Sequence, residues 1–90
     1  MPKTQALCGG WSPYRELTDK DKAVFNEALK GFCGVGYQPK SVSTQIVAGV
    51  NYRFKCDATL PGPIPIQWEA IVEIYAPLEG KPHITGIQKI

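Results

Sequence analysis

The chain has 90 residues, with ten Lys and Arg against eight Asp and Glu, which gives a formal net charge of +2. A chain of this length forms one domain and buries only about 60–65% of its unfolded surface, which argues against a large active-site cleft. The charges are scattered rather than gathered in a basic stripe, so the composition does not favour a nucleic-acid partner.

The expected compartment follows from the apolar segments and the cysteines. The first seven residues have no apolar stretch of the signal-peptide kind, and no apolar run approaches the roughly 20 residues of a membrane span. We therefore expect a cytoplasmic protein with no membrane contact. Cys8, Cys33 and Cys56 lack a CxxC spacing, so neither a complete disulfide framework nor a metal site is indicated. Free thiols are favoured, while a Cys33–Cys56 bridge or a Cys8-linked dimer remains open.

The first third of the chain predicts a trunk followed by a helix. Residues 1–13 carry Gly9, Gly10 and Pro13 and show little periodicity, which indicates a flexible N-terminal trunk. A helix is expected after Thr18, which can cap it together with Asp21 in a capping-box arrangement. The apolar stripe of this helix consists of Val24, Phe25, Ala28, Leu29 and Phe32. The glycines that end it are Gly31, Gly34 and Gly36.

The rest of the chain changes from a period of 3.6 to a period of 2. This alternation predicts strands over residues 40–47, 50–57, 67–75 and 83–90. In the second strand, Tyr52 and Phe54 should point inward, and Arg53 and Lys55 outward. Short turns make neighbouring strands antiparallel, so we expect an α+β fold with one long helix on a twisted sheet of four to five strands. The first and third turns, at 47–50 and 77–82, should lie at the same end of that sheet.

The first turn has an unusual composition. Gln45-Ile46-Val47-Ala48-Gly49 places apolar side chains where a soluble protein normally has polar ones. Such a turn, displayed at the edge of a small domain, indicates a surface for a partner.

Four features in this order resemble the cystatins, which inhibit papain-like cysteine proteases. They are a glycine after a short trunk, one long helix, the QxVxG turn at Gln45–Gly49 followed by Val50-Asn51-Tyr52, and a second turn that contains a proline. The resemblance covers nearly the whole chain. The small size, the unpaired cysteines and Lys81-Pro82 are similar to the intracellular stefin branch. The resemblance implies a cystatin-like fold and a reversible, tight-binding, competitive inhibitor that needs no cofactor, metal or catalytic residue.

The resemblance also implies a wedge in which the trunk and the two turns enter the protease cleft together. Residues 6–8 would occupy the non-primed subsites, and Gly9 or Gly10 would turn the backbone away from the nucleophile. The residues implied in protease binding are Leu7, Cys8, Gly9, Gly10, Gln45, Ile46, Val47, Ala48, Gly49, Pro77 and Leu78. Secreted and plant cystatins commonly carry a tryptophan in the second turn, where this chain has Pro77-Leu78. The resemblance assigns no role to Trp11, which either packs under the arm or touches the protease.

Other interpretations remain beside this one. The chain could be a cystatin-fold binding module without protease inhibition, or, instead of the expected monomer, a domain-swapped dimer that hides the first turn. An enzyme would pair Cys33 or Cys56 with His83, although no motif places an Asp or Asn to orient His83. A surface for single-stranded nucleic acid would need Tyr52 and Phe54 outside, whereas the alternation sends them inward.

Overall fold

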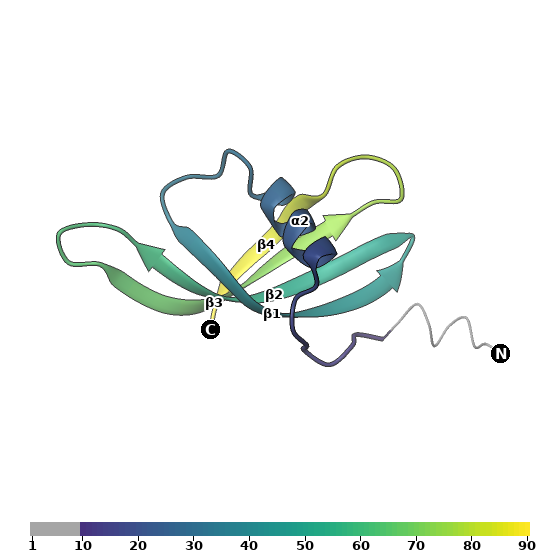
Figure 1. Ribbon diagram of the computed structural model, residues 1–90, viewed down its shortest axis with the longest axis horizontal. Coiled ribbons are helices and arrows are strands. Elements are labelled where there is room, and N and C mark those ends of the chain that lie inside the picture. The colour runs from purple at the N-terminus through teal and green to yellow at the C-terminus, as the bar shows by residue number, and fades with distance from the viewer. Residues whose placement is uncertain (1–9) are drawn as a thin grey trace.

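A helix and a meander of strands make up the computed structural model, which describes residues 10–90 (Figure 1). In this range the elements are α2 (Asp19–Ala28), β1 (Gly36–Val47), β2 (Gly49–Leu60), β3 (Ile66–Ala76) and β4 (His83–Lys89). The strands form one antiparallel sheet in the order β1-β2-β3-β4, and α2 lies across one face of it (Figure 1). The expected α+β architecture is confirmed, with four strands in the described residues.

The helix begins as its capping residues predict. The Thr18 hydroxyl accepts a hydrogen bond from the Asp21 amide at 3.2 Å, and the Asp21 carboxylate accepts one from the Thr18 amide at 2.8 Å. This capping box satisfies two amides that the first helical turn leaves unpaired. The helix is ten residues long, shorter than expected, because the chain turns at Gly31 with a φ of +83°. Phe32 therefore lies beyond the helix and is exposed.

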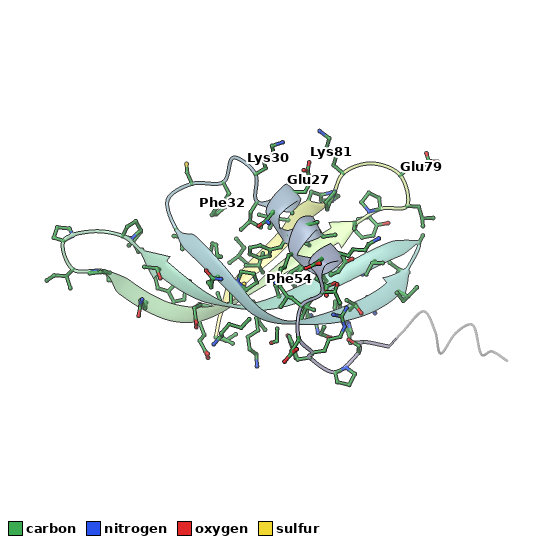
Figure 2. All side chains as sticks on the ribbon, viewed as in Figure 1. Glu27, Lys30, Phe32, Phe54, Glu79 and Lys81 are labelled. Atoms are coloured by element: carbon green, nitrogen blue, oxygen red, sulfur yellow. The ribbon has the colours of Figure 1, made fainter. Side chains whose placement is uncertain are left out.

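The core lies between α2 and the face of the sheet that it covers. The Phe25 ring of the helix meets the Phe54 ring of β2 edge-on, with centroids 4.9 Å apart, and Figure 2 shows Phe54 beneath the helix. Tyr52 stacks on Phe54 from two residues away in the same strand. The predicted alternation of β2 is thus confirmed, because its aromatic side chains are buried and Arg53 and Lys55 lie on the opposite face. The buried cluster consists of Phe25, Val42, Tyr52, Phe54, Cys56, Val72 and Ile74.

The first strand begins at Gly36, before the expected position, and contains an irregularity in its register. Pro39 pairs with Cys56 and Ser41 pairs with Lys55, which leaves Lys40 as an extra residue in β1. The Lys40 ammonium lies 3.0 Å from carboxylate oxygens of both Asp57 and Glu69. The bulge residue therefore links three neighbouring strands on the exposed face.

The N-terminal arm attaches to the free side of β1. Trp11 forms an isolated antiparallel bridge with Gln45, and Arg15 forms one with Val42. The Ser12 amide donates to the Thr44 carbonyl at 2.8 Å, and the Ser12 hydroxyl accepts from the Thr44 amide at 3.0 Å. Within residues 10–90 the arm thus makes single bridges rather than a fifth strand.

Candidate functional site

The first turn is a tight connection between β1 and β2. Ile46 pairs with Val50 and Val47 pairs with Gly49, so residues 47–49, at the ends of the two strands, close the turn around Ala48. Three-residue hairpin loops usually end on a residue with positive φ, and Gly49 has a φ of +110°. Ile46 and Ala48 are exposed, and Val47 is half-buried. The turn therefore presents apolar side chains, and the positive φ of Gly49 allows its backbone to reverse direction.

Gly49 also lies directly against the beginning of the second turn. A Cβ atom at this position would lie 3.0 Å from the Cα of Pro77 and nearer still to the carbonyl oxygen of Ala76. Val50, the next residue, pairs with Ala76. The expected proximity of the two turns is therefore present in the structure, and both lie at the same end of the sheet (Figure 1).

The second turn carries a strongly exposed side chain among the predicted binding residues. Pro77 is half-buried, whereas Leu78 is 80% exposed. Glu79 and Lys81 follow in the same loop, and Figure 2 shows both side chains pointing away from the sheet. Gly80 has a φ of +111°, which allows the loop to return to β4. The second turn is therefore an apolar tip with charged side chains beside it.

The arm approaches this end of the sheet as well. Trp11 and Arg15 pair antiparallel with β1, so the arm, followed backwards from Arg15 to Gly10, approaches the first turn. Gly10 is exposed. The predicted binding residues Leu7, Cys8 and Gly9 lie outside the described residues. The structure thus brings the two turns together, and the arm at Gly10 lies on the side of β1 that leads to them.

The arm makes two contacts with the face of the sheet opposite the helix, and the sequence pattern predicts neither partner. The Arg53 guanidinium lies over the Trp11 ring, with Cζ 3.9 Å from the ring centroid, and its Nε lies 3.2 Å from a Glu73 carboxylate oxygen. The Lys55 ammonium lies 4.9 Å from the centroid of the Tyr14 ring. Cation–π contacts of this kind hold aromatic rings on a charged surface. Of the two sequence interpretations of Trp11, packing under the arm is the one that this geometry matches.

A row of polar and aromatic side chains crosses the sheet next to the two turns. Gln45, Asn51, Tyr75 and His83 are direct cross-strand partners from β1 to β4. The Asn51 amide nitrogen lies 2.9 Å from the Gln45 side-chain oxygen, and the Tyr75 and His83 rings meet edge-on at 5.8 Å. Direct cross-strand partners share a face of the sheet. The glutamine of the QxVxG motif therefore faces a neighbouring strand that fixes its side chain.

The cysteines that the structure describes differ in environment. Cys33 is exposed and Cys56 is buried, and neither forms a disulfide within residues 10–90, so the Cys33–Cys56 bridge is absent. Burial raises the pKa of the Cys56 thiol to about 12. A thiol with this pKa is almost entirely protonated at neutral pH and is a weak nucleophile. Cys56 therefore does not suit the role of nucleophile in the alternative enzyme.

Other site types can be assessed for residues 10–90. Tyr52 and Phe54 are almost fully buried, so they offer no stacking surface for a nucleobase. The described residues contain no group of three side chains able to hold a metal ion. The helix in this range is too short and too polar to cross a membrane.

A second apolar tip lies at the opposite end of the sheet, where β2 turns into β3 (Figure 1). Ile64 is 83% exposed there, and Leu60 and Ile66 are exposed beside it. Apolar exposure alone therefore does not single out the end with the two turns. Comparisons of this chain with family models, with curated proteins and with solved structures gave no match.

Proposed function

We propose that this protein is a reversible, tight-binding, competitive inhibitor of papain-like cysteine proteases. It occludes the active-site cleft with the N-terminal trunk and the two turns. The observation that carries the proposal is the contact of Gly49, in the QxVxG turn, with the beginning of the Pro77–Leu78 turn. The resemblance of the sequence to the stefin branch of the cystatins supplies the identity of the target.

The physical basis of inhibition is a rigid apolar edge. The two turns are supported by paired strands and contact each other, so they lose little conformational freedom on docking. Ile46 and Leu78 are exposed in the free protein and would leave water in the complex. No bond forms or breaks in this scheme, so inhibition is reversible and competes with substrate.

The trunk supplies the remaining contact. Leu7 and Cys8 occupy the non-primed subsites, and a glycine at 9 or 10 turns the backbone away from the catalytic cysteine. The arm leaves β1 toward the first turn, which is the direction that this role requires. The expected partner is thus a papain-like, cathepsin-like protease rather than a nucleic acid or a membrane.

Titration of papain, or of a cathepsin L-like enzyme, with the pure protein tests the proposal. We expect loss of activity that rises with protein concentration, is overcome by added substrate and is recovered on dilution. Absence of inhibition at micromolar protein would refute the proposed function.

A matched pair of variants locates the inhibitory end. Leu78 and Ile64 are 80% and 83% exposed, but they lie at opposite ends of the sheet. We expect Leu78→Asp to weaken inhibition about tenfold or more, since a carboxylate would be taken out of water at the contact. Ile64→Asp should leave inhibition unchanged. Equal effects of the two substitutions would contradict the wedge assignment.

The second candidate is a binding module of the same fold that does not inhibit proteases. The exposed apolar tip formed by Leu60, Ile64 and Ile66 favours it, because such tips commonly mark interaction surfaces. This candidate predicts that Ile64→Asp removes a binding activity while Leu78→Asp retains it. The same pair of variants therefore separates the two functions.

A further inference from the structure

Tyr75 connects the two turns that form the proposed inhibitory edge. It lies near the end of β3, two residues before Pro77. Its hydroxyl donates a hydrogen bond to the carbonyl oxygen of Ala48 in the first turn. Its ring edge lies beside Gly49, where the Cε1 atom would be 3.2 Å from an added Cβ. One side chain thus contacts two consecutive residues of the opposite turn.

The position of the ring follows from the register of the sheet. Tyr75 pairs with Asn51 on one side and with His83 on the other, so its ring lies on the face opposite the helix. The His83 ring meets it edge-on, with an angle of 80° between the ring planes. Neighbours on both strands therefore restrict the ring to the orientation in which its hydroxyl reaches Ala48.

The hydrogen bond from Tyr75 to Ala48 has a larger effect on the position of the first turn than on the free energy of unfolding. The Ala48 carbonyl lies at an exposed tip, so a water molecule could donate a hydrogen bond to it if Tyr75 did not. Without the hydroxyl, the first turn would keep its strand pairing and the approach of Gly49 to Pro77, but it would lose the hydrogen bond that links Ala48 to the second hairpin. This contact therefore adds a restraint on the position of the first tip relative to the second.

We infer that Tyr75 is a positioning residue that holds the first turn against the second in the arrangement that binds the protease. It acts through Ala48 and Gly49. The effect of Tyr75 on inhibition rests on the proposed function. The restraint that Tyr75 places on the first turn is a property of the free protein and does not.

The variant that isolates the hydroxyl is Tyr75→Phe, which keeps the ring and its contact with His83. We expect its inhibition constant to rise about 3- to 10-fold, the range that corresponds to one net hydrogen bond. Amide hydrogen exchange at Ala48, Gly49 and Val50 of the free variant should accelerate. Exchange at Gly62 and Ile64, at the distant tip, should not change.

Ile74→Val is the matched control, because Ile74 is the neighbouring residue whose side chain points into the core. We expect it to lower the midpoint of denaturant unfolding while leaving the inhibition constant unchanged. An inhibition constant for Ile74→Val as high as that of Tyr75→Phe would overturn the inference, because a loss of stability would then explain both.

Two further outcomes separate this inference from the proposed function. If the unaltered protein does not inhibit papain, the proposed function fails, and accelerated exchange at residues 48–50 in Tyr75→Phe still supports the restraint. If the unaltered protein inhibits but Tyr75→Phe inhibits equally well, Tyr75 is not a positioning residue and the proposed function stands. Unchanged exchange at residues 48–50 overturns the restraint itself.

Discussion

Gly49 combines two requirements that no other residue type meets at this position. Its φ of +110° lies in the region that L side chains rarely adopt, and its surroundings leave no space for a Cβ atom. The positive φ is required by the turn, and the lack of space for a Cβ atom arises from the contact with the hairpin of β3 and β4. The two requirements can be separated, since other glycines of this chain have a positive φ without such a contact.

Gly49→Ala and Gly34→Ala provide that separation. Gly34 has a φ of +105°, but a Cβ there would have no neighbour within 4 Å. We expect Gly34→Ala to lower the free energy of unfolding by about 1 kcal/mol, and Gly49→Ala by about 2–4 kcal/mol, since the second also forces backbone apart. Denaturant unfolding measures both values. Equal losses would mean that the close approach of the two turns is absent in solution.

Asp21 is a second residue whose surroundings determine its chemistry. Burial alone would raise the pKa of its carboxyl, but hydrogen bonds from Arg15 and Thr18 and the charge of Arg15 outweigh burial, so the pKa lies below its ordinary value. The Arg15 guanidinium lies 2.5 Å from the carboxylate. A lowered pKa in the folded state means that the stabilisation is present above the unfolded pKa and is lost as pH falls through the folded one.

The expected pH dependence follows from that sign. The free energy of unfolding should decrease below about pH 4, the unfolded pKa of an aspartate, and Asp21→Asn should reduce this slope. At pH 7 the substitution should cost about 1–3 kcal/mol, because it removes charged hydrogen bonds from a buried site. Asp19→Asn, in the same turn but exposed, should cost about 0.3–1 kcal/mol through the helix dipole alone. Equal costs for the two would contradict the role of the buried contacts.

The elements of the molecule are joined across the sheet by contacts that the arm provides. Trp11 and Tyr14 lie over Arg53 and Lys55, and Arg53 in turn pairs with Glu73 of β3. Three segments are thus connected on the face opposite the helix. This arrangement gives the arm a defined direction where it passes β1, and the proposed function depends on that direction.

Trp11→Ala tests the attachment of the arm. Loss of the cation–π contact should raise the rate of tryptic cleavage after Arg15 about 2- to 5-fold, since cleavage follows local opening. Trp68→Ala is the control, because Trp68 lies near Lys89 and not near the arm. Cleavage rates can be followed by mass spectrometry. An unchanged rate for Trp11→Ala would show that the backbone bridges alone hold the arm.

At the scale of the whole molecule, the two apolar tips lie at opposite ends of an elongated sheet (Figure 1). The proposed inhibitory end depends on the closed form of the first turn, in which Ala48 accepts the hydrogen bond from Tyr75 and Gly49 lies against Pro77. In a domain-swapped dimer, β1 and β2 would continue through residues 47–49 as one extended segment. The closed turn and its contacts would then be absent.

Separation of oligomers tests this consequence. We expect the monomer fraction from size-exclusion chromatography to inhibit papain and any dimer fraction to be inactive until it dissociates. Inhibition titrations of the two fractions at equal chain concentration provide the measurement. A dimer with full inhibitory activity would show that the first turn stays closed in it, or that the turn is not part of the inhibitory edge.

Much of this architecture could be predicted from local patterns. The alternation of Tyr52, Arg53, Phe54 and Lys55 assigned both faces of β2, because successive side chains of a strand point to opposite sides. The strand order followed from the short turns, and the proximity of the first and third turns followed from the strand order. The bulge at Lys40 could not be predicted, since it depends on how β1 pairs with β2.

The sequence by itself determined the helix start, the four strands, their inward faces and the two turns that meet at one end of the sheet. Only the tertiary structure decided how those turns are held, through Tyr75 and Ala48, and where Trp11 lies, on Arg53. The physical reason is distance along the chain. Capping and alternation act between residues a few positions apart, whereas Tyr75 and Ala48 are separated by 27 positions and meet only after the sheet has formed.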